Sequence, residues 1–150
     1  PDAEITCLEL SAQALCYLRR NIARHGVPNL TAVEGDALSP PPEIVGRYDA
    51  ILSNPPYIAA GQLPALQREV RQEPAMALDG GPDGLRFYRS FHRLYPPMLS
   101  PGGFLLYEIG EEQGGAVSAL LRTAGLQKVQ ILRDLSGLDR AVLGFSPPNK

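Results

Sequence analysis

Apolar residues along this chain follow two periods, one typical of strands and the other of helices. Short apolar or alternating runs predict strands over residues 5–10, 30–34, 48–53, 104–109, 129–131 and 140–145. Apolar residues three or four positions apart predict helices over residues 12–24, 84–98 and 112–124, and a short helix over 63–70. Ser11 and Asp83 are expected to cap the first two long helices, because their side chains accept hydrogen bonds from free backbone amides. Leu15, Leu18 and Ile22 are predicted to form one buried stripe.

The order of these elements predicts an α/β fold. Helix and strand alternate through most of the chain, which is typical of a mostly parallel sheet covered by helices on both faces. No helix separates the last two strands, so they are predicted to pair antiparallel. A length of 150 residues is that of one domain, and we expect a single domain over residues 1–150.

Composition removes several classes of function. With a net charge of −2, the chain has no overall electrostatic attraction to nucleic acid or to an anionic membrane. No apolar run approaches the ~18 residues of a membrane span. Two cysteines are too few for a disulfide framework, which favours a reducing, cytoplasmic location. His25 and His92 do not form a ligand-spaced pair, so we expect no metal site.

Polar side chains stand where three of the predicted strands end. Glu9 ends the first strand, Asp36 follows the second and Asn54 follows the third. Ligands of open α/β sheets bind beyond the carboxyl ends of the strands, where an acid can accept hydrogen bonds from ribose hydroxyls. A second acid one strand over can reach an adenine amino group. Taken singly, either acid is more often a helix cap or a solvated residue.

The segment Asn54-Pro55-Pro56-Tyr57 is a sharper signal. Two successive prolines fix φ twice and remove two backbone donors, which leaves a stiff loop with free carbonyls. The Asn54 side-chain oxygen and the Pro55 carbonyl could together hold both hydrogens of a planar –NH₂ group. The Tyr57 ring offers a surface on which that plane could stack.

The segment resembles the Asn/Asp-Pro-Pro-Tyr motif of S-adenosylmethionine-dependent amino-group methyltransferases. Further motifs follow in order along the chain: Asn-Pro-Pro-Tyr-Ile at 54–58, Glu73-Pro74 with Ala77 to Leu85, Tyr107-Glu108-Ile109-Gly110 with Gln113, and Asp139-Arg140. Together they make the chain similar to the HemK-type release-factor glutamine N5-methyltransferases over nearly its whole length.

The resemblance implies a Rossmann-like class I methyltransferase sheet and S-adenosylmethionine as cofactor. The acceptor would be the side-chain amide nitrogen of the glutamine in the Gly-Gly-Gln loop of class 1 peptide release factors. By motif position, Glu9 would bind the cofactor ribose and Asp36-Ala37 would lie against the adenine. Asn54 would act in catalysis and also border the cofactor, and Asn54, Pro55, Pro56 and Tyr57 would hold the substrate amide.

Two features depart from the family pattern. The chain begins at Pro1 and reaches an apolar run by Ile5, with no glycine-rich loop before it. We therefore expect a fragment that lacks the first strand, its loop and helix, and the N-terminal helical domain of the family. The missing strand would lie between the strands that end at Glu9 and Ser53, so the fragment alone is expected to fold poorly or to borrow a strand. Ala37 is also small for stacking on adenine.

Two other functions stay open. A DNA or RNA amino (adenine N6-type) methyltransferase would share the strand-end motif, because an exocyclic amine is also a planar –NH₂. The acidic balance and the lack of a basic, aromatic segment weigh against direct nucleic-acid binding. A non-catalytic remnant that binds only a partner is the third reading. Glu108 is expected either to orient substrate or a loop, or to be structural. The arginines of segment 68–93 are interpreted as a solvated face.

Overall fold

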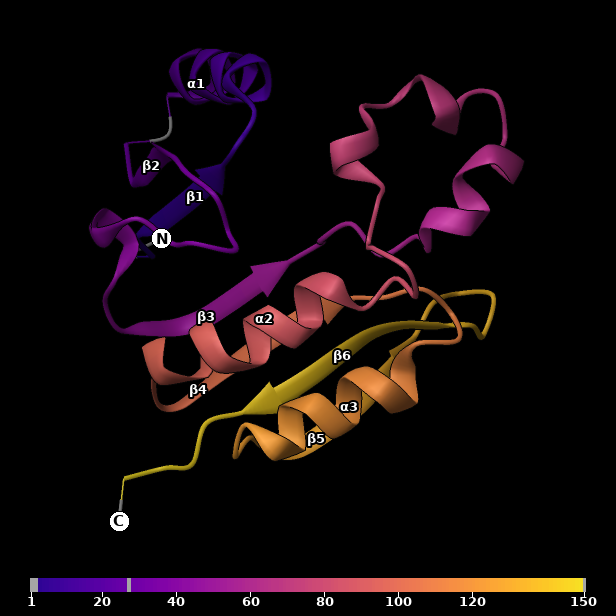
Figure 1. Cartoon of the computed structure of the whole chain (residues 1–150). Helices are drawn as coiled ribbons and strands as arrows, with labels where there is room; N and C mark the ends of the chain where they lie inside the picture. The colour runs from indigo at the N-terminus through magenta and orange to yellow at the C-terminus, as the bar shows by residue number, and fades with distance from the viewer. Residues whose placement is uncertain (1–2, 27, 150) are drawn as a thin grey trace. The chain divides into compact units, whose positions relative to one another are not determined.

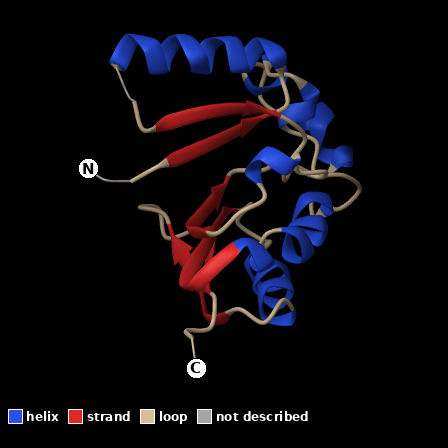
Figure 2. Ribbon diagram, turned by 90° about the vertical axis from the view of Figure 1, so that its left-hand side faces the viewer, coloured by secondary structure: helices blue, strands red, loops and turns tan. Residues whose placement is uncertain are grey.

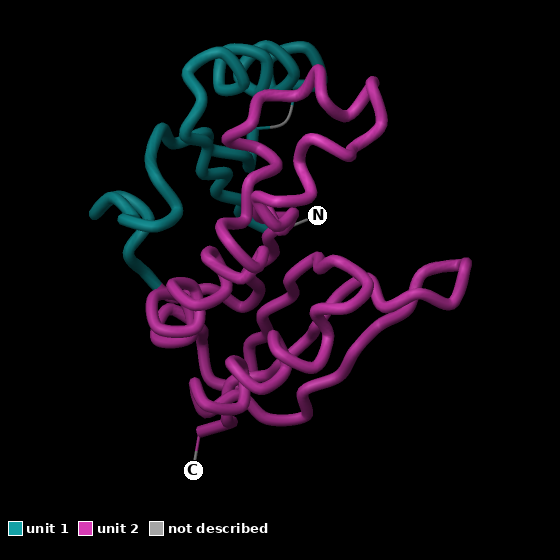
Figure 3. The backbone as a smooth tube through the Cα atoms, turned by 45° about the vertical axis from the view of Figure 1, so that its right-hand side comes forward, with its two compact units in different colours: residues 1–46 teal, residues 47–150 magenta. Residues whose placement is uncertain are grey.

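The computed structural model describes residues 3–26 and 28–149 (Figure 1), so Pro1, Asp2, Val27 and Lys150 lie outside the described residues. The chain divides into two compact units, Pro1–Gly46 and Arg47–Lys150 (Figure 3), and each is described by itself. The assignment of one domain to residues 1–150 stays a prediction.

The first unit is a strand–helix–strand. Strand β1 (Ile5–Glu9) and strand β2 (Leu30–Glu34) pair in parallel, with Glu9 opposite Glu34 at their carboxyl ends. Helix α1 (Ala12–His25) connects them, and a short 3-10 helix (Pro42–Ile44) follows. The Ser11 cap is confirmed, because its side chain accepts a hydrogen bond from the Ala14 amide at 3.3 Å. Gly26 ends α1 with φ of 59°, a left-handed conformation that costs glycine little.

Burial in this unit is lower than the sequence predicts. Of the expected stripe on α1 only Leu15 is buried, while Leu18 and Ile22 are partly exposed. Ile5, at the start of β1, is 44% exposed. A strand is buried only when elements cover it on several sides, and in the described part of this unit β1 has β2 as its one strand partner. β1, whose short apolar run is typical of a buried strand, is thus exposed at its start and only partly buried toward Glu9.

The second unit holds a four-stranded sheet in the order β3-β4-β6-β5. Its strands are β3 (Tyr48–Ser53), β4 (Leu99–Glu108), β5 (Gln127–Arg133) and β6 (Asp139–Phe145). β3 and β4 are parallel, while β6 runs antiparallel to both β4 and β5. The predicted antiparallel pairing of the last two strands is confirmed, and the limits of the third strand are those expected.

Helices α2 (Arg86–Leu94) and α3 (Gly114–Thr123) lie on one side of this sheet (Figure 2). Tyr88 and Phe91 of α2 pack on Tyr107 of β4, with ring centroids 5.9 and 5.7 Å apart. All three rings are at most 2% exposed. The Tyr88 hydroxyl donates to the Glu108 carbonyl at 2.7 Å, which fixes α2 on the end of β4.

The predicted helix over 63–70 is wrong. The chain between β3 and α2 instead contains three short 3-10 helices, Ala60–Ala65, Val70–Gln72 and Ala75–Ala77. Pro64 has no backbone N–H and clashes with the preceding turn, so it prevents an α-helix from continuing. The amphipathic spacing alone did not outweigh this proline.

Other boundaries also differ from the expectation. Asp83 does not cap α2, which begins three residues later and has Leu85 at its cap position without a side-chain bond. Pro96 begins a separate 3-10 helix, Pro96–Met98, so Met98 is not part of α2. β4 begins at Leu99, five residues early, and shifts register against β3 where Gly102 takes φ of 78°.

Candidate functional site

The proline-rich loop follows β3 directly and begins with an exposed residue, after which the chain is buried or partly buried. Pro55 is buried, Pro56 and Tyr57 are partly buried, and Asn54 is exposed. All described peptide bonds here are trans, and each proline holds its φ near −65°. Within residues 3–26 and 28–149, the Asn54 side chain has no hydrogen-bond partner, so its amide can bind a ligand.

A cavity of about 310 Å³ opens beside Asn54. It is bordered by the ends of three strands, because β6 starts at the edge of the sheet where β3 and β4 finish. Polar groups at this edge come from Asn54, Glu108 and Arg140, and the remaining lining residues are Leu52, Ser53, Leu106 and Ala141. This is the edge at which open α/β sheets bind ligands.

Tyr57 and Glu108 meet at this edge. The Tyr57 hydroxyl donates a hydrogen bond to Glu108 Oε1 at 3.3 Å. Burial, and then the negative charge of Glu108, raise the pKa of Tyr57 above its ordinary value. The phenol therefore keeps its proton at neutral pH and remains a hydrogen-bond donor.

Arg140 is held at the rim of the cavity by a carboxylate and a carbonyl. Its guanidinium donates to Asp134 Oδ2 at 3.1 and 3.3 Å and to the Ile109 carbonyl at 3.5 Å. The hydrogen bond to Asp134 raises the pKa of Arg140. Sequence reasoning noted Arg140 only as part of a motif, because the pairing with Asp134 depends on the turn between β5 and β6.

A backbone bridge holds the far end of the proline-rich loop. The Ile58 amide donates to the Leu78 carbonyl at 3.0 Å, and the Gly80 amide donates to the Ile58 carbonyl at 2.8 Å. Ile58 and Asp79 thus form an isolated parallel bridge. Residues 79–84 contain a turn, in which the Gly84 amide donates to the Gly81 carbonyl at 3.3 Å, and Gly80 also holds the residue after Tyr57.

In the first unit, the two strand-end acids lie at the carboxyl ends of neighbouring parallel strands. Glu9 Oε1 accepts the Ser11 amide at 2.7 Å, and Asp36 Oδ1 accepts the Leu38 amide at 2.8 Å. The Gly35 amide donates to the Glu9 carbonyl at 3.0 Å and ties the two strand ends together. Each carboxylate thus stabilises local backbone through one oxygen. Ala37, next to Asp36, is partly buried.

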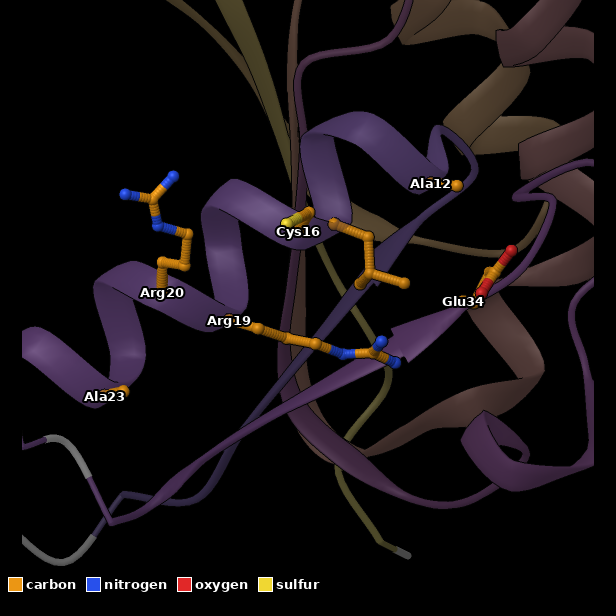
Figure 4. Close-up of a pocket in the computed structure, with 7 residues that line it drawn as sticks. Ala12, Cys16, Arg19, Arg20, Ala23 and Glu34 are labelled. Atoms are coloured by element: carbon orange, nitrogen blue, oxygen red, sulfur yellow. The ribbon is translucent and has the colours of Figure 1, made fainter.

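The first unit also has a hollow of about 380 Å³ along α1 (Figure 4). It is lined by Ala12, Leu15, Cys16, Arg19, Arg20, Ala23 and Glu34. The Arg19 side chain extends across it toward β2, whereas Arg20 points away (Figure 4). Neither Glu9 nor Asp36 lines this hollow, so it is separate from the strand-end acids.

The structure thus gathers the predicted site residues into two sets. Asn54, Pro55, Pro56 and Tyr57 lie with Glu108 in the second unit, and Glu9, Asp36 and Ala37 lie in the first. Among the described residues, no three His, Cys, Asp or Glu side chains are grouped to hold a metal. No helix within residues 3–26 and 28–149 is long and apolar enough to cross a membrane.

Comparison with known families decides what kind of fold carries this site. The family model of the methyltransferase small domain matches residues 1–82, more than half of the chain. The chain belongs to the methyltransferase small domain family. The match includes Glu9, Asp36, Ala37 and the whole Asn54–Tyr57 loop.

Individual relatives of this methyltransferase domain agree with the family. The chain is 46% identical over 149 residues to the release factor glutamine methyltransferase of Cereibacter sphaeroides, covering 98% of this chain and 52% of that protein. It is 40% identical over 147 residues to the enzyme of that name from Moorella thermoacetica, covering 97% and 51%. The resemblance inferred from the motifs is confirmed. The chain spans about half the length of these curated relatives.

Solved structures confirm the α/β methyltransferase fold. A methyltransferase from Pyrococcus furiosus matches with a TM-score of 0.70 at 19% identity, over 96% of this chain and 63% of that one. A release factor-specific protein-(glutamine-N5) methyltransferase from Alicyclobacillus acidocaldarius matches with a TM-score of 0.53 at 26% identity, over 97% and 81%.

Proposed function

We propose that this chain is the catalytic portion of an S-adenosylmethionine-dependent methyltransferase. Its acceptor is the side-chain amide nitrogen of the glutamine in the Gly-Gly-Gln loop of class 1 release factors. The observation that carries the proposal is the Asn54 amide, which is exposed and has no partner among the described residues, beside a cavity at the strand ends. The printed names of the relatives support the same acceptor.

The proline-rich loop suits a carboxamide because it offers two acceptors in a fixed relation. The Asn54 side-chain oxygen and the Pro55 carbonyl each accept one of the two amide hydrogens. The prolines keep these acceptors in place before substrate arrives, so little ordering is needed on binding. The Tyr57 ring, held by Glu108, limits the plane of the bound amide.

The strand-end acids of the first unit fit the cofactor. A carboxylate has about four acceptor sites, so Glu9 can accept ribose hydroxyls while it also accepts the Ser11 amide. Asp36 and Ala37 would lie against the adenine. S-adenosylmethionine supplies a methyl group on a positively charged sulfur, which is already a strong electrophile.

Alignment is therefore the main task of the protein residues. An amide nitrogen is a weak nucleophile, because its electron pair is delocalised into the carbonyl. By accepting both N–H groups, Asn54 and Pro55 direct that nitrogen at the methyl carbon and stabilise the positive charge that develops on it. The N–C bond forms as the S–C bond breaks and sulfur keeps the electron pair. The nitrogen then loses a proton to water, so no dedicated base is required.

The test is transfer of a labelled methyl group from S-adenosylmethionine to a class 1 release factor. Because the chain spans about half of its relatives, the assay uses the intact gene product. We expect label on the release factor and none when the acceptor glutamine is replaced by alanine. Equal labelling of both proteins would contradict the proposed acceptor.

Partner and location follow from the same proposal. The partner is a release factor, which acts in translation, so we place this protein in the cytoplasm without direct nucleic-acid binding. Methyl transfer to DNA or RNA, with affinity that falls steeply as salt rises, would support the nucleic-acid alternative instead.

A further inference from the structure

We propose that Gln113 is a positioning residue for methyl transfer, because its side-chain amide fixes the carbonyl of Tyr57 and with it the proline-rich loop. The inference rests on the proposed function and assigns a role to a residue that does not line the cavity. Gln113 lies at the cap position of α3, 56 residues after Tyr57.

The Gln113 amide makes three hydrogen bonds to three separate segments. Its Nε2 donates to the Tyr57 carbonyl at 2.9 Å and to the Gly84 carbonyl at 3.3 Å. Its Oε1 accepts the Gly110 amide at 3.0 Å. The proline-rich loop, the segment before α2 and the segment after β4 are thus joined at one side chain.

The orientation of this amide is set by its neighbours. Two carbonyl oxygens can only accept and one backbone amide can only donate, so the –NH₂ must face the carbonyls. A carboxamide is the side chain that supplies two donors and an acceptor at this point. Glutamate, which has the same shape, would place an oxygen against the Tyr57 and Gly84 carbonyl oxygens.

Two glycines show how closely the surrounding backbone packs on Tyr57. A Cβ at Gly84 would clash with the Tyr57 carbonyl oxygen and with Gln113 Nε2. A Cβ at Gly80 would lie 2.8 Å from the Tyr57 Cα. Gly84 has φ of 75°, a conformation suited to glycine. The absence of a side chain at Gly84 allows the Gln113 amide to reach the Tyr57 carbonyl, and its absence at Gly80 lets the Gly84 backbone lie against Tyr57.

The stiff loop carries this constraint to the reacting amide. β3 fixes the entry to the loop at Ser53, and Gln113 fixes its exit at Tyr57. The two prolines between them have locked φ angles, so the loop backbone cannot adjust when Tyr57 moves. A displacement of Tyr57 therefore also moves the Asn54 side chain or the Pro55 carbonyl. A shift of about 1 Å at a reacting centre can cost about 100-fold in rate.

The test compares Gln113→Glu with Gln113→Met in the intact gene product. In Gln113→Glu a carboxylate oxygen repels the Tyr57 and Gly84 carbonyl oxygens, and we expect kcat to fall about 100-fold. Gln113→Met removes the bonds without repulsion, and we expect a fall of about 10-fold. In both variants the KM for the release factor and the Kd for S-adenosylmethionine should change by less than about threefold. Gln130→Glu is the matched control, since Gln130 is exposed on β5, and its kcat should equal that of the unchanged protein.

The possible results separate this inference from the function on which it rests. No methyl transfer by the unchanged protein would overturn both. Transfer by the unchanged protein, with a lower melting temperature but unaltered kcat in the Gln113 variants, would leave Gln113 purely structural and overturn the inference alone. If Gln113→Glu fails to fold, the test rests on Gln113→Met, for which a lower kcat with an unchanged KM supports the inference and an unchanged kcat overturns it.

Discussion

The Tyr57 hydroxyl donates a hydrogen bond to Glu108 Oε1 across the ends of two neighbouring parallel strands, at 3.3 Å. Tyr57 belongs to the loop after β3, and Glu108 is the last residue of β4. The backbone of Glu108 is itself fixed, because its carbonyl accepts the buried Tyr88 hydroxyl. The core under α2 thus determines where the Tyr57 ring stands relative to Asn54.

This contact predicts that Tyr57 and Glu108 act as one unit. Tyr57→Phe keeps the ring but removes the donor, and Glu108→Gln keeps an acceptor oxygen but removes the charge. We expect each to lower kcat about 10-fold, in line with the loss of a hydrogen bond to a charged group at about 1.5 kcal/mol. The double variant should fall little further, since both changes act on the same hydrogen bond: Tyr57→Phe removes it, and Glu108→Gln removes the charge that strengthens it. Steady-state kinetics on all four proteins would measure this, and multiplicative losses would show that the two residues act independently.

Asn54 is predicted to matter for turnover and not for cofactor affinity. Asn54→Ala removes an acceptor for the substrate amide, and we expect kcat to fall at least about 100-fold, as for other groups that stabilise charge in a transition state. The Kd for S-adenosylmethionine, measured by calorimetry, should stay within about threefold. Asn21→Ala, on the exposed face of α1, is the control. Equal losses of kcat and cofactor affinity would contradict the proposed role.

Glu9 is predicted to show the opposite pattern. Glu9→Gln keeps an oxygen for the Ser11 amide but weakens acceptance from ribose hydroxyls. Hydrogen bonds to a charged acceptor contribute about 1.5–3 kcal/mol, so the cofactor Kd should rise about 10- to 100-fold. Glu34→Gln offers a matched control, because Glu34 is exposed and lies opposite Glu9 on β2. A similar rise in Kd for both variants would indicate a general charge effect.

Local signals predicted the fold well where one residue decides the outcome. Ser11 caps α1 as expected, α1 ends one residue beyond its predicted limit, and β3 has the limits that its apolar run predicts. The prediction failed over 63–70 and at Asp83. Over 63–70, Pro64 prevents the α-helix that the apolar spacing predicts. Asp83 hydrogen-bonds to Arg89 instead of capping α2. A pattern of apolar spacing carries no information about such competition.

The candidate site divides in the same way. The Asn54–Tyr57 loop could be predicted because four adjacent residues contain the acceptors, the stiffness and the ring. The hydrogen bonds from Gln113 could not be predicted, because their acceptors, Tyr57 and Gly84, lie 56 and 29 positions earlier in the sequence. The contact of Tyr57 with Glu108 spans 51 positions. Only the folded chain brings these groups within hydrogen-bonding distance.

Asp83 did not cap α2, but it should be recognisable in solution by its acidity. Arg89 Nη1 donates to Asp83 Oδ1 at 2.8 Å, its Nη2 pairs with Oδ2, and the Leu85 amide also donates to Oδ1. The hydrogen bonds from Arg89, and then the one from Leu85, lower the pKa of Asp83 to about 2. We expect the Asp83 carboxyl to titrate near pH 2 when followed by carbon-detected NMR.

The sign of the linked stability follows from this depressed pKa. The folded protein holds the Asp83 proton less tightly than the unfolded chain. The Asp83–Arg89 pair therefore stabilises the folded state above about pH 4, and this stabilisation is lost as the pH falls toward 2. The melting temperature should therefore drop over this interval, and by less in Asp83→Asn. Arg89→Gln should return the Asp83 midpoint toward 3.8, whereas Arg93→Gln, exposed on the same helix, should leave it unchanged. A midpoint near 3.8 in the unchanged protein would mean that the pair does not form in solution. The segment that leads from Gly84 into α2 would then lack this restraint.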